Sequence, residues 1–450
     1  MRTVAITALI AVSTVVGQVG STVPARAAPF EAAGPAESAP MAAPAASAAP
    51  NPSCAGDPLL GVVRGVGGRI LAEIGRRTLR ARPGLRVQLP DGVYGWSWAS
   101  SPGCDAVALG GPRGRILLVD LERERRMRGV SLGGRWAAGL IAWPRPDRLV
   151  GISGSFESPR IVTVSVPGGR VVASHRLRGR PWASEATSLG LAILMAPDER
   201  IGSATLAVAD PDGGLHRIPL SGIRAGFDEV NPRRLMGRQI VPGLAVDETA
   251  GRAYVVAANE PLVAEVDLAS RVVSYHGVRD RGADATAVAA KGLAYGAYRT
   301  ARWVGDGTIA VAGEVTRTRR DWRRLARRGQ PVTSTDPYGL RLIRTADWTS
   351  TTLNPLLQSF ALAGPILLGM NSDPLALAGA KPTGLVAYGT DGRRRFTRFR
   401  GQARGWLRAV AWPYAYVRDL RPRRTSVVDL RTGRTVGEAG SRRPPVLLVR

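Results

Sequence analysis

The sequence has few of the residues on which catalysis and metal binding usually depend. Its 450 residues include two cysteines and three histidines. His175, His216 and His276 have no neighbouring carboxylate pattern. There is no Cys-x-x-Cys pair, no complete Gly-x-Ser-x-Gly turn and no glycine-rich loop leading into a helix. The sequence therefore predicts no cofactor, no metal site and no catalytic residue, although missing motifs alone do not exclude an enzyme.

Long apolar runs are also missing outside the first 27 residues. Met1–Ala27 has a basic residue near its start, an apolar core and a small-residue end, Ala25-Arg26-Ala27. Polar residues interrupt the core, which falls short of the ~20 apolar residues that a spanning helix needs. We predict a secretory signal peptide cleaved after Ala27, with a retained anchor as the alternative. The mature chain is then expected to be secreted, extracellular or wall-associated, without a transmembrane segment.

Residues 28–52 are mostly Ala, Pro, Ser and Gly, a composition typical of a disordered linker. The folded domain is expected to cover 53–450. Cys54 and Cys104 lie within it, and in an exported protein two cysteines most simply form one disulfide. Closing a loop of this length would stabilise the fold by roughly 4 kcal/mol.

Residues 243–278 carry the clearest strand pattern in the chain. Four runs rich in valine and other β-prone residues are separated by turns that contain Gly, Asn, Asp or Pro. The runs are Leu244–Val246, Ala253–Ala257, Leu262–Asp267 and Val272–His276. This pattern predicts a four-stranded antiparallel sheet. Because a lone sheet leaves both apolar faces exposed, it also implies neighbouring sheets of the same kind.

The third of these runs recurs along the chain. Its signature is an alternation of apolar residues that ends in Val-Asp or an equivalent, followed by a turn. Residues comparable with Val266 are Ile74, Val119, Val164, Val208, Ile343, Ala387 and Val428. Five of the seven spacings are 41 to 45 residues, within the ~40–45 typical of a propeller blade. The two longer spacings contain insertions near 221–240 and 315–337.

The stretch Gly243–Val278 resembles the YVTN-type repeat of WD-repeat-like β-propellers. The matching residues are Val246-Asp247, Gly251, Tyr254-Val255-Val256, Asn259 and Val266-Asp267. The resemblance covers about one blade well, and the other copies match only the third strand and its turn. It implies a propeller fold. Related propellers serve as binding scaffolds, surface proteins and occasionally enzymes, so the resemblance implies little about function.

The two ends of the domain predict how the ring closes. Strands are expected at Leu59–Val63, Arg69–Ile74 and Thr78–Val87, with no inner strand before them, while one strand, Pro444–Val449, is left over at the end. This last strand can complete the first blade and leave no exposed sheet edge. We therefore expect an all-β chain that forms a single β-propeller of four-stranded antiparallel blades. Eight blades are favoured, with seven as the alternative, and the C-terminal strand closes the ring.

Charge is the feature most open to a functional interpretation. The chain has 62 basic and 35 acidic residues, a formal net charge of +27, and all but two of the basic residues are arginine. Such a surplus attracts polyanions. Two segments concentrate arginine beside aromatic residues, Thr316–Arg328, which could form a short helix, and Arg393–Arg404. The candidate polyanion-binding residues are Arg319, Arg320, Arg323, Arg324, Arg327, Arg328, Arg393, Arg395 and Arg398.

Two classes of function fit these observations. The favoured one is an exported, non-catalytic propeller, expected to be a monomer, that binds an unknown protein or an acidic envelope polymer; nucleic acid is disfavoured for an exported protein. The alternative is an extracellular hydrolase or lyase that acts on a carbohydrate or lactone through carboxylates at the channel mouth. Candidates for that role are Asp91, Asp105, Asp247, Glu185 and Asp306. Convergence of two or more of them would favour the enzyme, whereas an arginine-lined channel would favour binding.

Overall fold

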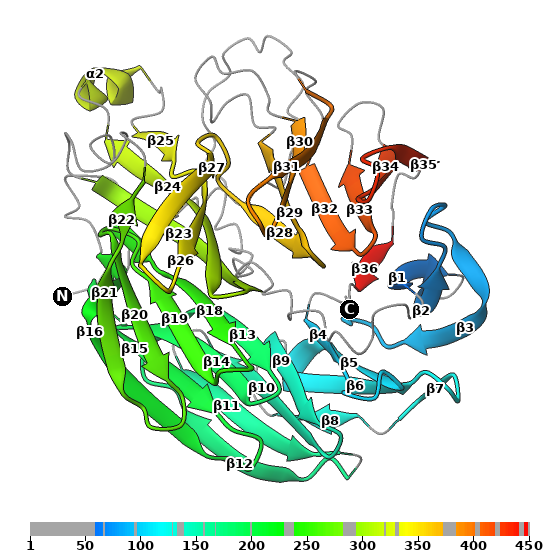
Figure 1. Ribbon diagram of the computed structural model, residues 1–450. Coiled ribbons are helices and arrows are strands. Elements are labelled where there is room, and N and C mark those ends of the chain that lie inside the picture. The colour runs from blue at the N-terminus through cyan, green and yellow to red at the C-terminus, as the bar shows by residue number, and fades with distance from the viewer. Residues whose placement is uncertain are drawn as a thin grey trace, which may run out of the picture.

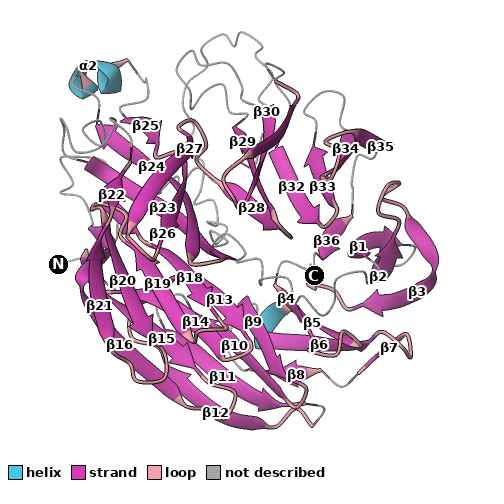
Figure 2. Cartoon of the chain, viewed as in Figure 1, coloured by secondary structure: helices cyan, strands magenta, loops and turns pink. Residues whose placement is uncertain are grey.

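The fold is taken from a computed structural model of the chain. The residues described are 59–65, 68–93, 97–127, 129–132, 139–155, 158–166, 168–198, 200–228, 238–281, 294–318, 321–328, 333–371, 384–400, 406–418, 424–440 and 445–448. Nearly all regular structure within these ranges is β-strand (Figure 2). The predicted signal peptide, the linker and Cys54 lie outside the described residues.

Six of the sheets stand as separate antiparallel units. Sheet I has the order β3-β2-β1-β36 and contains β1 (Leu59–Gly65), β2 (Gly68–Ile74), β3 (Ala81–Leu89) and β36 (Val446–Leu448). Sheet II contains β4 (Trp98–Ser100), β5 (Ala106–Gly110), β6 (Arg115–Asp120), β7 (Arg125–Arg126) and β8 (Val130–Ser131), with a 3-10 turn at Pro112–Gly114. Sheet III contains β9 (Gly139–Arg145), β10 (Arg148–Ser155), β11 (Ser158–Ser165) and β12 (Val171–Arg176).

The other three separate sheets repeat this arrangement, with strands in chain order. Sheet IV contains β18 (Gly243–Asp247), β19 (Arg252–Val256), β20 (Leu262–Asp267) and β21 (Val273–Gly277). Sheet V contains β28 (Phe360–Ala363), β29 (Ile366–Asn371), β30 (Gly384–Gly389) and β31 (Arg394–Arg398). Sheet VI contains β32 (Trp406–Ala411), β33 (Tyr414–Arg418), β34 (Arg424–Asp429) and β35 (Thr435–Gly440).

The remaining strands form one long sheet of eleven strands, in the order β13-β14-β15-β16-β17-β23-β24-β26-β27-β22, with β25 paired to β24. Its first strands are β13 (Arg180–Thr187), β14 (Gly190–Ala196), β15 (Gly202–Ala209), β16 (Leu215–Asp228) and β17 (Arg238–Val241). The others are β22 (Arg279–Asp280), β23 (Ala294–Gly305), β24 (Thr308–Thr318), β25 (Thr333–Pro337), β26 (Leu340–Arg344) and β27 (Thr349–Asn354). Helix α2 (Trp322–Arg327) lies between β24 and β25.

The long sheet corrects the expected blade count. The described residues form six separate blades rather than eight or seven, because the strands of the remaining repeats are joined. The cause is β16, a strand of 14 residues. Most of it pairs with β15, but Gly226–Asp228 pair with β17, and β17 then pairs in parallel with β23. The predicted insertion at 221–240 supplies this connection.

The second predicted insertion, at 315–337, extends the long sheet instead of leaving it. Strand β24 runs on to Thr318, and β25 returns beside it from Thr333 to Pro337. The short helix expected between them is present as α2, with Leu325 buried at 4% exposure.

The Val-Asp signature owes its recurrence to the turn that follows it. In sheet IV, the Asp267 carboxylate accepts the backbone N–H groups of Ala269 (3.1 Å) and Ser270 (2.7 Å). In sheet VI, Asp429 accepts the N–H of Arg431 at 2.8 Å. An aspartate that bonds its own backbone in this way satisfies the amides of a tight turn and reverses the chain.

The sheets follow one another around a central axis (Figure 1). The inner strands contact each other in succession, from β4 through β9, β13, β18, β23 and β28 to β32. The fold is a β-propeller. Strand β36 pairs with β1 through Leu60–Leu448, Gly61–Leu447 and Val62–Val446, so the C-terminal strand joins the first sheet as predicted.

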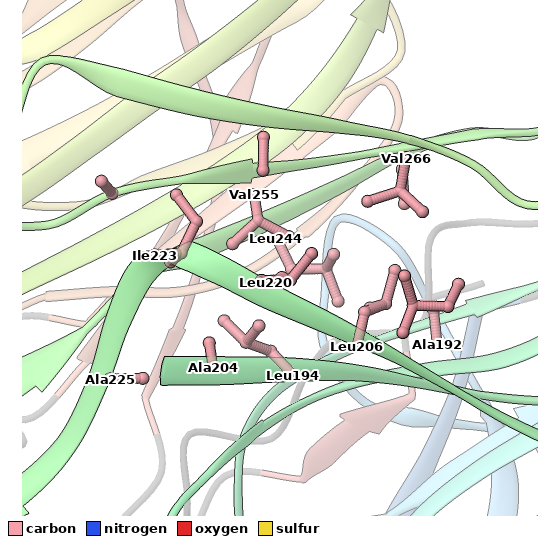
Figure 3. Packing of buried hydrophobic residues seen from close by; sticks show 14 of the residues in the cluster. Ala192, Leu194, Ala204, Leu206, Leu220, Ile223, Ala225, Leu244, Val255 and Val266 are labelled. Atoms are coloured by element: carbon pink, nitrogen blue, oxygen red, sulfur yellow. The ribbon is translucent and has the colours of Figure 1, made fainter. Parts of the chain in front are cut away.

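The hydrophobic core lies between the sheets. Between sheet IV and strands β13–β16, small and branched side chains interlock (Figure 3). Leu194, Leu206 and Leu220 face Leu244 and Val255 in this cluster. A similar cluster packs the first sheet on the last; it contains Leu59, Ile74, Ala411, Tyr416 and Val427. Each fully buried leucine or valine stabilises such a seam by about 1.5–3 kcal/mol.

Candidate functional site

One ion pair connects two inner strands that are not neighbours. Arg302 on β23 pairs with Glu185 on β13, and β18 lies between these strands in the order of contacts. The Glu185 side chain is 6% exposed and that of Arg302 is 24% exposed. Burial lowers the pKa of Arg302 to about 10, so the guanidinium is still charged at neutral pH. Glu185 is thus paired with Arg302, a residue that the sequence analysis did not identify as its partner.

Two of the other carboxylates considered for catalysis accept hydrogen bonds within their own turns. Asp105 accepts the Ser101 hydroxyl at 2.6 Å. Asp247 accepts the backbone N–H groups that follow it, including that of Thr249 at 3.1 Å. Asp91 and Asp306 are exposed in separate turns. Within the described ranges, these contacts therefore give no support to the alternative of an enzyme with two or more carboxylates at the channel mouth.

A second buried charge cluster lies where the long sheet faces sheet IV. The Arg299 and Arg341 guanidinium groups lie 3.6 Å and 4.4 Å from the centre of the Tyr338 ring. Arg341 also donates to Asp280 at 2.7 Å. Burial lowers the pKa of Arg299 to about 10 and raises that of Glu314, whose backbone oxygen accepts from Arg299 at 3.1 Å. These contacts join β22, β23, β24 and β26, which is a structural role.

The arginines predicted around 319–328 are placed only in part. Arg319 and Arg320 lie outside the described residues, and Arg323 lies in α2. Arg324 pairs with Asp321 at 2.8 Å. Arg327 and Arg328 are exposed.

The second predicted group lies on the outermost strand of sheet V, as expected. Arg393 is exposed in the turn before β31. Arg395 pairs with Asp391 at 2.8 Å. Arg398 donates to the backbone oxygen of Gly433 in sheet VI. Two of the three side chains therefore have partners within the protein.

The cysteines and histidines give no separate site. The described part of the chain has no free cysteine, which agrees with the expected disulfide of Cys104. Because Cys54 lies outside the described residues, that pairing stays a prediction. His216 lies 3.3 Å from Asp210 and His276 lies 3.0 Å from Glu265, carboxylates that the sequence pattern had not indicated.

Among the described residues, no group of three or more His, Cys, Asp or Glu is placed to hold a metal ion. A cavity of about 210 Å³ lies beside β14 and β15, and Arg178, Asp198 and Thr205 line it. It is smaller than the ~300–1,000 Å³ usual for small-molecule sites. None of the charged groups described above lines it.

Sequence reasoning missed a group of arginines where sheet I meets sheet VI. The Arg77 Nε donates to the Tyr414 hydroxyl at 3.2 Å, and Arg76 donates to the backbone oxygen of Trp412 at 2.6 Å. The Arg431 guanidinium lies over the Trp412 ring, 5.9 Å from its centre. Arg76 and Arg77 are adjacent but lie hundreds of residues before Arg431, so only the predicted pairing of the chain ends could have indicated that Arg431 lies near them.

No protein-family model and no curated protein matches the sequence. Among solved structures, the dihydro-heme d1 dehydrogenase NirN in complex with DHE is 12% identical, with a TM-score of 0.49; the match covers 86% of this chain and 73% of that one. Sqt1 of Saccharomyces cerevisiae is 8% identical, with a TM-score of 0.46 and coverage of 80% and 89%. BamB from Moraxella catarrhalis is 10% identical, with a TM-score of 0.41 and coverage of 76% and 87%.

At these identities and TM-scores, the similarities to solved structures do not support any conclusion about function. The assignment of a propeller fold rests on the arrangement of the sheets in this chain. The YVTN repeat type has no matching family and stays a prediction. No helix in the described ranges is long and apolar enough to cross a membrane.

Proposed function

We propose that the chain is an exported, monomeric, non-catalytic β-propeller that serves as a binding scaffold for an acidic polymer of the cell envelope. One observation carries the proposal. The described carboxylates on the inner strands, Glu185 and Asp247, are both engaged by the protein, whereas arginines are exposed on several turns. The alternative enzyme, which would act through carboxylates at the channel mouth, needs one of them free to accept or donate a proton. An arginine surplus instead favours binding of anions.

The proposal includes a finer description of the ring. The long sheet contains two antiparallel quartets, β13–β16 and β23-β24-β26-β27, which we take to complete a closed ring together with the six separate blades. Support comes from the β1–β36 pairing and from the packing of sheet I on sheet VI. The match of Tyr254-Val255-Val256 and Val266-Asp267 in sheet IV supports the YVTN repeat type.

Export is supported by the sequence of Met1–Ala27. The test is fractionation of the source cells, followed by a wash with rising salt. We expect an intact protein that begins at Ala28 and leaves the envelope only at high ionic strength, because the screening length falls from about 10 Å at 0.1 M to 3 Å at 1 M. A cytoplasmic, uncleaved protein would contradict export, and release at low salt would contradict binding to an anionic polymer.

A second test addresses catalysis. The purified protein is incubated with acidic and neutral polysaccharides and with lactones, and the products are separated by mass. Retention of the polymer without cleavage is the expected outcome. Turnover that Glu185→Gln or Asp247→Asn abolishes would overturn the non-catalytic assignment.

A further inference from the structure

The seam where sheet I meets sheet VI carries an unbalanced positive charge. It consists of the turn Gly75–Arg80 in sheet I and of Trp412–Tyr414 and Asp429–Arg434 in sheet VI. Its charged residues are the arginines Arg76, Arg77, Arg80, Arg431 and Arg434 and the single carboxylate Asp429. That carboxylate already accepts the backbone N–H of Arg431 at 2.8 Å. These turns therefore contain five arginines and one carboxylate, which accepts a hydrogen bond within its own turn.

Arginines in other turns are neutralised by carboxylates of the protein. Arg145 pairs with Asp212 at 2.6 Å and Arg281 with Asp347 at 2.8 Å. By contrast, the part of the chain that the structure describes offers neither Arg77 nor Arg431 an ion-pair partner. Unlike these turns, the seam has no described carboxylate paired with Arg77 or Arg431. Both guanidinium groups are therefore available to a carboxylate of another molecule.

Aromatic rings hold the two exposed guanidinium groups in place. Arg77 lies 5.9 Å from the centre of the Tyr414 ring, and Arg431 lies at the same distance over Trp412. The Trp412 ring is itself supported by Gly364, where a Cβ atom would come within 3.2 Å of the ring. Cation–π contact restrains a guanidinium without using its N–H donors. The Arg431 guanidinium group has no hydrogen-bond acceptor among the described residues. The ring contact therefore orients this group and leaves its N–H groups able to donate.

We infer that this seam binds carboxylate groups of an acidic polysaccharide, an inference that rests on the proposed function and identifies its surface. A planar guanidinium fork matches a carboxylate with two parallel hydrogen bonds. Two such forks on adjacent turns suit a polymer with a repeating carboxylate better than a single small anion. The exposed residues around them, Thr78 and Thr432, add hydroxyl groups that suit sugar hydroxyls.

An acidic peptide fits this surface less well. Peptide recognition uses pockets for side chains or an open sheet edge that accepts a strand. The seam consists of turns, and its exposed side chains are arginine and threonine. A saccharide needs no such pocket, because its carboxylates and hydroxyls meet donors at the surface.

The test uses the full mature chain and three immobilised probes: polygalacturonate, poly-L-glutamate and neutral dextran. Binding is measured for the wild type and for the double variant Arg77→Gln/Arg431→Gln. The matched control is Arg113→Gln/Arg170→Gln, which removes the same charge at two exposed positions outside the seam. Circular dichroism and the thermal midpoint establish that all three proteins are folded.

The wild type is expected to bind polygalacturonate and not dextran. The seam variant should lose at least about tenfold in affinity, since each hydrogen bond to a charged group contributes a factor of this order. The control should stay within about twofold. Equal affinities of the seam variant and the control would overturn the inference while leaving the proposed function standing.

Two other outcomes of the binding experiment would also overturn the inference. Tighter binding of poly-L-glutamate than of polygalacturonate would replace the saccharide by an acidic peptide and overturn the inference. A wild type that binds no anionic probe would remove the proposed function itself, and the inference with it.

Discussion

The pairing of the last strand with the first sheet can be tested by single substitutions. Leu448 in β36 is fully buried and packs with Leu60 and Leu71 of sheet I and with Val107 of sheet II. Replacing a buried leucine by alanine costs about 2–5 kcal/mol, from lost transfer free energy and from the cavity that remains. Because Leu448 lies in the cluster between sheet I and sheet II, we expect Leu448→Ala to lower the free energy of unfolding by about 3 kcal/mol.

A matched control lies in the same strand. Val446 is 36% exposed, so Val446→Ala should cost less than about 1 kcal/mol. The assay is urea unfolding followed by tryptophan fluorescence, with the slope of the transition compared among variants. An unchanged slope assigns the difference to stability rather than to a change in the unfolded state.

A double-mutant cycle tests the register itself. Leu60 lies directly opposite Leu448 in the β1–β36 ladder, and residues in contact couple by about 0.5–3 kcal/mol. Leu60→Ala and Leu448→Ala should therefore not be additive. Additivity within about 0.3 kcal/mol, or equal costs for Leu448→Ala and Val446→Ala, would refute the pairing of the chain ends.

Further predictions concern two ion pairs and a turn. Glu185→Gln should lower the free energy of unfolding, measured in urea, by about 3 kcal/mol, because it leaves the charge of Arg302 without its partner. The exposed pair Arg252–Glu265 (2.7 Å) provides the control: Arg252→Gln should lower the free energy of unfolding much less than Glu185→Gln, because solvent screens an exposed pair. Equal losses would contradict a buried role for Glu185. The pKa of Asp347 is lowered to about 2 by hydrogen bonds from Thr349 and by nearby arginine. Its contribution is thus present above about pH 4 and lost as the pH falls toward 2. The stability difference between wild type and Asp347→Asn should shrink over that range, and a difference that does not change with pH would contradict the shift.

The sequence predicts much of the fold because local chemistry repeats. In sheet IV, the runs expected at Leu262–Asp267 and Val272–His276 coincide closely with β20 and β21. The Val-Asp pattern is informative because the aspartate satisfies turn amides within three residues of itself. The pairing of Val446–Leu448 with β1 was also predicted, since the first blade lacked one strand and one strand was left over at the end of the sequence.

Long-range pairing is what the sequence does not specify. The β16–β17–β23 connection depends on a parallel pairing of Gln239 with Gly296, and no local pattern distinguishes that partner from others. The same limit applies to the site. Glu185 was a candidate from its position, but its engagement by Arg302 depends on the geometry of the inner strands. The seam arginines come together only after the chain ends meet, so no nearby sequence pattern indicates them.

The position of β36 sets the timing of assembly during synthesis. Strands β1, β2 and β3 must wait until β36 has been synthesised before their sheet is complete. Until then β1 keeps an open edge, able to pair with the wrong segment or with another nascent chain. The first sheet therefore reaches its finished form only after β36, the last described strand, has been synthesised.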